Sequence, residues 1–559
     1  MSPGIRLFAA PALLFAAALL CYLLPARMAG RARLIAVVAA IAAGALLLSE
    51  ASLVLPSSRV ERDLGQFAPG VQLVARADPA TLAIALLATV LALAALAERR
   101  RQPLERSALL LCLAGTYVAA LAGNAVLLFG GVEIANVGAL LLAAGGAPRL
   151  RLRARIAFAV QHASSLGLLI AAVALQSNLQ TSDFTAVPAD AMDWWIAGPW
   201  ALTGVVRLLA PAALPDRAGR TASAAWLPVG AAPCGLLVLL RLAEVTGTQM
   251  PAGVSAWLLA VGVAAAAWAT VRAARHSRVP ARAGRALALV VAGQAIAMVG
   301  AGTPAAITAL AALGLALLLG IAAAPAWGAG GDEGSGRSAV WTRAAALAVM
   351  GGLPLGFGTT AAILSSGAVA SDGLPRSVVA VFTAATAVVA AAAGAMAARV
   401  ALVEAPPRGR LRGARVDAAL ALGVSAVAGL LPGLAQTVFV QPVASVAGAT
   451  ATSIDVATAR VPGGGWSGGY LLLAMLVALA VAGSAASLEG RRWPAPEVPL
   501  PATPPLTLGG PGRVPGRLAV PHAAAQAMRA LAGIDGWLVE QPGLALVVAG
   551  AIACLFIFR

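Results

Sequence analysis

One acidic residue in the middle of a long apolar segment is the first candidate for chemistry. Glu133 lies in GNAVLLFGGVEIANVGALLLAAGG, residues 123–146, and no other residue of that segment is charged. Ionisable side chains within a bilayer are costly and commonly mark ion or proton pathways. Glu133 is therefore a candidate proton-carrying carboxyl group. The alternative is a structural carboxylate that pairs with an arginine from another helix.

Two further side chains extend this candidate proton pathway. Arg207 lies within the apolar segment ALTGVVRLLAPAALPD, residues 201–216. A group that is always charged needs a counter-ion there, and Glu133 is the expected one; otherwise Arg207 extends to the interface or into a water-filled cavity. His162 lies in a third apolar segment. It could relay a proton, or it could simply hydrogen-bond a neighbouring helix.

The composition identifies the environment of these residues. Of the 559 residues 60% are hydrophobic and 11% are charged, against about 25% charged in soluble domains. All 39 basic residues are arginine and none is lysine, which excludes any mechanism that uses a titrating lysine. The arginines fall between apolar segments, as in the loops of membrane proteins. We therefore expect a lipid bilayer around the chain and no nucleic acid as a partner.

Apolar segments of about 20 residues recur along most of the chain and predict membrane-spanning helices. We expect an all-α, polytopic integral membrane protein with about 14–16 transmembrane helices. The predicted regions are N-terminal helices over 1–75, a core over 76–370, further helices over 371–488, a Pro-rich linker with an amphipathic interfacial helix over 489–540, and a final helix over 541–559. Arg241, Arg343 and Arg399 lie near span ends, where we expect them to anchor to headgroups.

Helix breaks are a second expected feature of this protein. Pro354 and Gly356 interrupt the apolar segment 342–368, and Pro432-Gly433 falls near the end of another segment. Proline within a helix kinks the axis and frees backbone carbonyl groups, and broken helices of this kind line ion sites in transporters. The four cysteines and three histidines are scattered. The sequence therefore predicts no cofactor and no metal site.

Several local motifs, in their order along the chain, resemble the antiporter-like membrane subunits of respiratory complex I, of membrane-bound hydrogenases and of Mrp-type cation/proton antiporters. They are Asp78-Pro79 before a span, the Glu133 segment, Arg155–Phe184, Leu214-Pro215-Asp216 and GGLPLGFGTTAAIL at 351–364. The resemblance covers roughly residues 75–370. It implies an antiporter-like fold with discontinuous helices and a Glu–Lys pair that is coupled to proton movement.

The departures from this family pattern concern the relay lysines. The lysine of the seventh family helix would fall at about Val206, next to Arg207, and a later one falls at Thr360. Only Glu133 is carried over as a proton-site residue, with Arg207 as a stand-in partner. The resemblance therefore implies a member that has lost part of its pumping machinery.

The leading hypothesis is a membrane subunit of a complex I-like assembly, of the NADH-quinone oxidoreductase or hydrogenase type. It would have no catalytic site of its own and would contribute to proton translocation or to its scaffold. We expect other membrane subunits of such a respiratory or hydrogenase-like complex as partners, and the bacterial inner membrane as the location. The alternative is a self-standing secondary transporter or ion antiporter with its site near Glu133 and Arg207.

Overall fold

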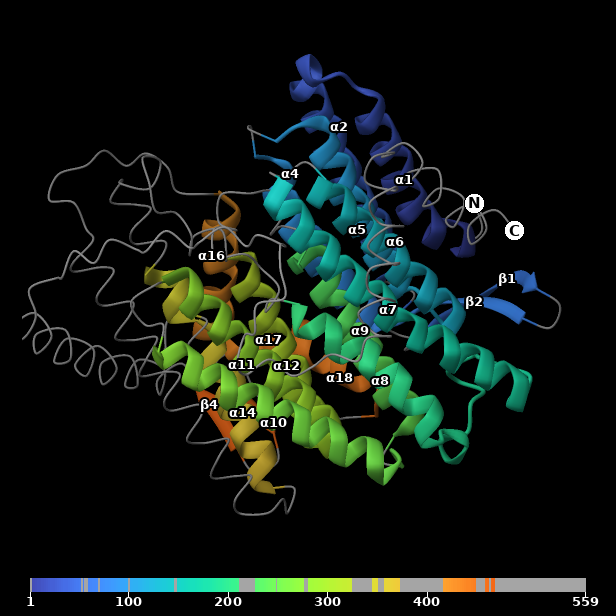
Figure 1. Ribbon diagram of the computed structural model, residues 1–559, viewed down its shortest axis with the longest axis vertical. Coiled ribbons are helices and arrows are strands. Elements are labelled where there is room, and N and C mark those ends of the chain that lie inside the picture. The colour runs from blue at the N-terminus through green and yellow to red at the C-terminus, as the bar shows by residue number, and fades with distance from the viewer. Residues whose placement is uncertain are drawn as a thin grey trace, which may run out of the picture.

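The computed structural model describes residues 3–51, 54, 59–68, 71–98, 101–144, 148–210, 227–247, 249–275, 280–323, 344–349, 356–371, 416–448, 458–461 and 464–467. Pro354, the linker and amphipathic helix predicted over 489–540, and the final helix predicted over 541–559 lie outside these residues. Most of the described chain forms long helices that pack side by side (Figure 1).

The described helices fall into two groups along the chain. The first group is α1 (Pro3–Leu23), η1 (Ala26–Met28), α2 (Ala29–Ser49), α4 (Pro79–Leu96), α5 (Pro103–Ala120), α6 (Ala125–Ala144), α7 (Pro148–Leu179), η2 (Ala189–Ala191) and α8 (Trp194–Leu208). The second group is η6 (Leu227–Ala231), α9 (Ala232–Thr246), α10 (Ala252–Arg275), α11 (Pro280–Ala301), α12 (Pro304–Ala322), α14 (Phe357–Ser371), α16 (Val416–Leu430), α17 (Pro432–Ala435), η8 (Gln436–Val440) and α18 (Gln441–Ser445).

Local sequence signals set where several of these helices begin. The carboxylate of Asp78 accepts a hydrogen bond from the backbone N–H of Thr81 at 2.8 Å, and a proline follows directly at the first position of α4. Thr303 caps α12 in the same way, again before a proline. A short polar side chain that accepts an otherwise unpaired N–H, followed by a residue with a fixed φ, is a strong helix start.

The polytopic membrane fold is confirmed. Within the described residues, eight helices are long and apolar enough to cross a membrane, and a bent pair raises this number to nine. The predicted 14–16 spans also include segments outside the described part of the chain. The bent pair joins Leu420–Leu430 to Pro432–Ser445 at an angle of 107°. Pro432-Gly433 therefore breaks a helix, in agreement with one interpretation of the sequence.

Two β-hairpins add to the predicted helices. β1 (Val60–Ala68) pairs antiparallel with β2 (Val71–Ala77), and β3 (Thr458–Val461) with β4 (Gly464–Ser467). The first hairpin projects from the helices in Figure 1. The sequence does not predict it, because charged residues follow one another in β1 and obscure the alternation that marks a strand. The boundary predicted between residues 75 and 76 falls inside β2.

Backbone bridges and arginine side-chain hydrogen bonds define two ends of the helix bundle. At the hairpin end, β2 pairs through Ala75 with Ala122, the residue pair Asn124 and Asp183 forms a second bridge, and Arg76 bonds Glu244. At the opposite end, which we call the arginine end, Arg106 donates to the carbonyl groups of Leu96, Glu98, Arg101 and Ala29.

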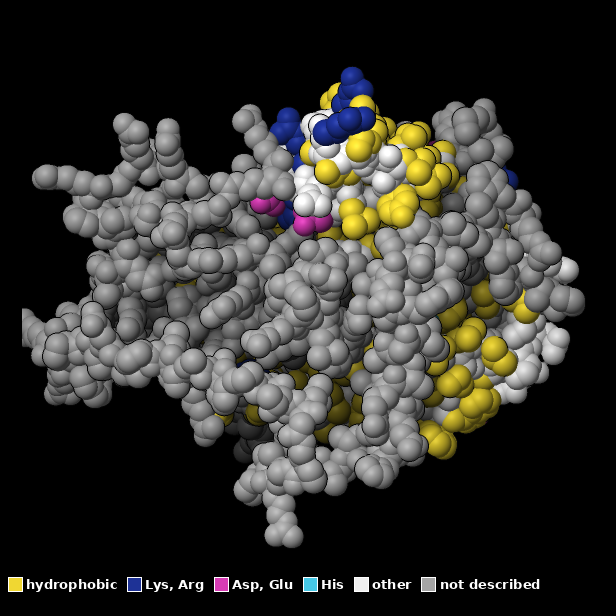
Figure 2. All heavy atoms as spheres, turned by 45° about the horizontal axis from the view of Figure 1, so that its top comes forward, with side chains coloured by type: hydrophobic (Ala, Val, Ile, Leu, Met, Phe, Trp, Pro, Cys, Tyr) yellow, Lys and Arg dark blue, Asp and Glu magenta, His cyan; other side chains and the backbone are white. Residues whose placement is uncertain are grey.

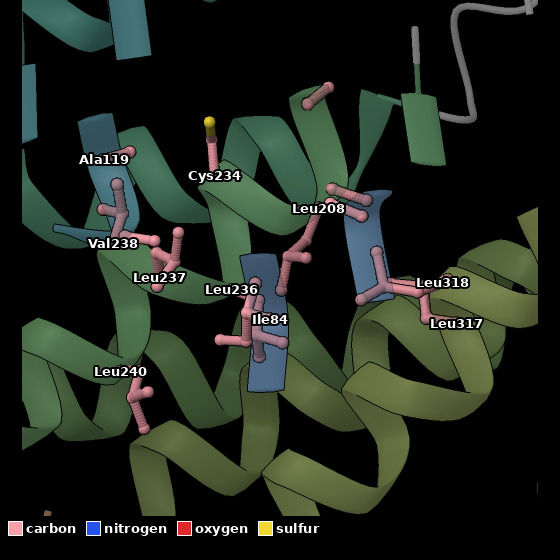
Figure 3. Close-up of a cluster of buried hydrophobic side chains, with 14 of the residues drawn as sticks. Ile84, Ala119, Leu208, Cys234, Leu236, Leu237, Val238, Leu240, Leu317 and Leu318 are labelled. Carbon is pink, nitrogen blue, oxygen red and sulfur yellow. The ribbon is translucent and has the colours of Figure 1, made fainter. Parts of the chain in front are cut away.

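The core of the bundle is built from aliphatic side chains and glycines. The buried cluster in Figure 3 includes Leu236 and Leu237 of α9, Ile84 of α4, and Leu317 and Leu318 of α12. Small residues let the backbones approach still more closely between α5 and α6. A Cβ atom on Gly131 would lie 2.3 Å from the backbone nitrogen of Ala119, and one on Gly115 would lie 2.3 Å from that of Ala135. Close packing of this kind holds helices together where lipid supplies no hydrophobic force.

This packing predicts opposite effects for two Gly→Ala changes. Gly131→Ala should destabilise the protein by about 1–3 kcal/mol, because overpacking forces helices apart. Gly198→Ala in α8 meets nothing within 4 Å and should be neutral or slightly stabilising. Thermal unfolding of the detergent-solubilised protein measures both changes. Equal melting temperatures for the two variants would contradict the close contact between α5 and α6.

The two ends also predict the orientation in the membrane. The helix ends and connections at the arginine end carry Arg27, Arg31, Arg33, Arg101 and Arg106. Figure 2 shows arginine side chains gathered beside exposed apolar ones. The loops at the hairpin end are richer in acidic residues. Because positive loops stay on the cytoplasmic side, the arginine end should face the cytoplasm.

Single cysteines at exposed positions check this orientation. In intact cells, a membrane-impermeant maleimide should label Asp63→Cys in the hairpin, and it should label Arg31→Cys only after permeabilisation. The three described native cysteines are buried, and the unsubstituted protein gives the background. The reverse labelling pattern would place the hairpin end in the cytoplasm.

Candidate functional site

Glu133 lies inside the bundle on α6 and is held by three polar side chains. Its carboxylate contacts His162 Nδ1 through Oε2 at 2.6 Å. Its other oxygen, Oε1, accepts hydrogen bonds from Asn136 Nδ2 at 3.0 Å and from Ser165 Oγ. His162 and Ser165 are both on α7, three residues apart, so they share one helix face. Glu133 is only 6% exposed, and its hydrogen bonds therefore replace water.

Arg207 reaches this site through an amide. The residue is fully buried on α8, and its Nη2 donates to Asn136 Oδ1 at 3.0 Å. Asn136 therefore accepts from Arg207 and donates to Glu133 at the same time. The expected direct ion pair of Glu133 and Arg207 is not formed in the described part of the chain, because the amide lies between them. The guanidinium Nε and Nη1 make no hydrogen bond there.

The three predicted pathway residues thus meet in one place. Glu133, His162 and Arg207 come from α6, α7 and α8, and they form a continuous polar chain with Asn136. His162 is the outermost member, because 35% of its side chain is exposed. Its ring stacks on Phe158, with the planes 3° apart. The roles of these residues in moving protons stay predictions.

Gly356, the second predicted helix-break residue, has a packing role in the structure. A Cβ atom on Gly356 would lie 2.5 Å from Ser425 Oγ, and one on Gly429 would lie 2.6 Å from the carbonyl carbon of Gly356. Ser425 Oγ also accepts from the N–H of Phe357 at 3.2 Å, at the start of α14. Gly356 therefore lets α14 begin directly against α16.

A second buried charge cluster, which we call the hairpin-end network, is not predicted as a unit by the sequence. Arg76 of β2 donates to both carboxylate oxygens of Glu244 at 2.6 Å and lies 3.3 Å from Asp78. Arg241 Nη1 lies 2.7 Å from Asp78 and 2.9 Å from Glu244. The two guanidinium groups also lie over the ring of Phe184, at 5.8 and 5.9 Å.

The network corrects the prediction for Arg241. The sequence indicates an anchor to lipid headgroups, because Arg241 is near the end of an apolar segment. In the structure Arg241 is fully buried, and its Nη1 and Nη2 contact two carboxylates and the carbonyl group of Ala120. A buried arginine must be paired in this way, since an isolated charge in a low-dielectric interior is very costly. Arg343 and Arg399 lie outside the described residues.

Asp78 stays ionised in this network. Burial by itself would raise the pKa of its carboxyl group, but the guanidinium groups of Arg241 and Arg76 outweigh that effect and lower the pKa below its ordinary value. A carboxyl group with a lowered pKa stabilises the folded state at neutral pH and loses that contribution as the pH falls. Asp78 is therefore suited to fix the network rather than to exchange protons.

Two pairs of residues in or next to the hairpin-end network can be recognised from the sequence. Asp78-Pro79 is a motif before a span, and Arg241 and Glu244 are three residues apart on one helix face. Arg76 and Glu244, however, are 168 residues apart, and no local pattern joins them. Asn136 and Ser165 are also short polar residues whose partners only the packing of three helices reveals.

Comparisons with known proteins show similarity in structure only. No family model matches the sequence, and no curated protein matches it. The fold is similar to a chain of the Mrp complex from Dietzia sp. DQ12-45-1b, with a TM-score of 0.70 and 20% identity over 86% of this chain. This chain spans 56% of the length of that one.

Two other solved complexes contain a similar chain. One is the membrane-bound sulfane sulfur reductase, an archaeal respiratory membrane complex, with a TM-score of 0.67 and 16% identity over 96% of this chain and 95% of the other. The other is respiratory complex I from Thermus thermophilus, with a TM-score of 0.63 and 17% identity over 80% of this chain and 100% of the other. The expected antiporter-like fold, that of a polytopic subunit in membrane complexes, is therefore confirmed.

Proposed function

We propose that this protein is a membrane subunit of a multi-subunit complex I-like assembly of the NADH-quinone oxidoreductase or hydrogenase type, and that it contributes to proton translocation there. The fold supports this proposal, because the three similar chains described above come from membrane complexes. The partners would be other membrane subunits of that complex, in the inner membrane of a bacterium. Electron transfer would belong to those partners.

The contact between Glu133 and His162 carries this proposal. A carboxylate oxygen and an imidazole nitrogen 2.6 Å apart are within the distance at which two groups exchange a proton. Both groups change charge when they do so, and both lie within apolar helices. Because His162 is partly exposed, it connects buried Glu133 to the surface of the bundle. The pair can therefore pass a proton between the interior and that surface.

Arg207 has a different part in this mechanism. Its guanidinium keeps its charge at any physiological pH, so it neither takes up nor releases a proton. Asn136 accepts from Arg207 and donates to Glu133, and this aligned amide favours negative charge on the carboxylate. Arg207 would thus hold Asn136 in place as a fixed hydrogen-bond donor to Glu133. In this proposal Glu133 and His162 exchange the proton, and Arg207 supplies a fixed charge beside them. The subunit would therefore work without a chain of titrating lysines.

Replacing Glu133 tests the proposal. Glu133→Gln keeps the shape of the side chain and removes its proton exchange, so proton translocation by the assembled complex should fall at least tenfold, about 1.4 kcal/mol. The complex is purified through a tag on this chain and reconstituted in liposomes, and a pH-sensitive dye reports translocation. Glu98→Gln at the arginine end is the matched control and should translocate normally.

The other outcomes separate the alternatives. Normal translocation by the Glu133→Gln complex would show that this chain serves as a scaffold and that the proton role is wrong. Proton or cation flux through the purified chain alone, without partners, would favour the self-standing transporter. Amounts of assembled complex are compared first, so that a loss of assembly is not counted as a loss of translocation.

A change at His162 distinguishes proton relay from simple hydrogen bonding. His162→Gln can still donate to Glu133 from its amide group but has no titrating group. If His162 exchanges protons, translocation should fall several-fold and its pH profile should change. Translocation that matches the unsubstituted complex at every pH would show that His162 only bonds one helix to another.

A further inference from the structure

The hairpin-end network and the Glu133 site are connected through α8 and α9. Trp200 of α8 is fully buried, and its Nε1 donates to the carbonyl oxygen of Val238 in α9 at 3.0 Å. Val238 lies one turn before Arg241. Trp200 also packs on Phe184, with ring centroids 5.6 Å apart. Phe184 is the ring that both guanidinium groups of the network cover.

The same two helices hold Arg207 in place. Gly235 of α9 lies directly behind Arg207, since a Cβ atom there would be 2.9 Å from Arg207 Cβ. Gly204 of α8 meets Leu239 in the same way, at 2.5 Å. The position of α9 along its axis therefore sets the position of Arg207. A shift of α9 would move the guanidinium group relative to Asn136.

Arg241 is the part of the network that fixes α9. Its side chain is fully buried and binds Asp78 at the start of α4, Glu244 on its own helix and the carbonyl group of Ala120 at the end of α5. The planar guanidinium group makes these contacts in fixed directions. An ammonium group in the same place would keep the charge but not the geometry.

We infer that Arg241 is a positioning residue for Arg207: the hairpin-end network fixes α9, and α9 sets the distance of the Arg207 guanidinium from the Asn136–Glu133 pair. This inference rests on the proposed function of Glu133 in proton exchange. Two routes carry the effect, one through Gly235 behind Arg207 and one through Trp200, which Phe184 links to the network.

The test compares two buried arginines in the assembled complex. Arg241→Lys keeps the positive charge, but a lysine cannot reproduce the planar set of contacts to Asp78, Glu244 and Ala120. Arg106→Lys is the control, because Arg106 is also fully buried but bonds carbonyl groups at the arginine end. Infrared difference spectra report the carboxyl band of Glu133, which is assigned as the band lost in Glu133→Gln.

In Arg241→Lys the Glu133 band should shift and the pH profile of translocation should change. The reason is that a displaced Arg207 alters the hydrogen bond that Asn136 donates to Glu133. Arg106→Lys should lower the amount or stability of the complex and leave the band and the pH profile unchanged. Trp200→Phe, which keeps the ring but loses the bond to Val238, should shift the band in the same direction.

Three results are decisive. An unshifted band and an unchanged pH profile in assembled Arg241→Lys would overturn the positioning role, even if the complex were less stable. If Arg241→Lys does not assemble, Trp200→Phe decides the positioning role through the same two measurements, because it leaves every charge in place. If Glu133→Gln translocates normally, the proposed function fails, whereas a failure of the positioning role alone leaves the Glu133→Gln effect intact.

Discussion

A permanent positive charge inside an apolar helix bundle is the constraint on which this structure depends. Arg207 cannot lose its proton and is fully shielded from solvent, so neighbouring groups must offset its charge. Asn136 accepts one hydrogen bond from Arg207 and donates another to Glu133. Glu133 in turn is held by His162 and Ser165. The polar chain across α6, α7 and α8 thus follows from the need to accommodate one arginine.

Close helix packing makes this accommodation possible. Gly115 and Gly131 bring α5 and α6 together, and Gly235 lets α9 lie directly against the base of Arg207. Larger residues at these positions would separate the helices and open the polar chain. The hydrogen bonds of the site therefore depend on glycines that are not part of it. The small residues bring the helices close enough for the buried polar groups to hydrogen-bond one another instead of water.

The sequence predicts which residues form the polar site better than it predicts the hydrogen bonds and ion pairs that join them. Glu133, Arg207 and His162 stand out because charged or titratable groups are rare in apolar segments, and the structure brings all three together. The bridge through Asn136 is not predictable, since an uncharged side chain in a span gives no sign of its partner. The hairpin-end network escapes prediction for a different reason. Its members belong to segments far apart in the chain, and the apolar setting of Arg241 indicates a surface anchor.

The absence of lysine has a more specific meaning once the contacts are known. A lysine beside Glu133 could give up its proton and take it back, so charge could pass from group to group. Arginine allows only the carboxylate and the imidazole to change their charge. The guanidinium group can still act through its distance, because its effect on Glu133 weakens as the two separate. In the proposed mechanism the position of Arg207 takes the place of lysine titration, and the buried ion pairs that fix α9 help to set that position.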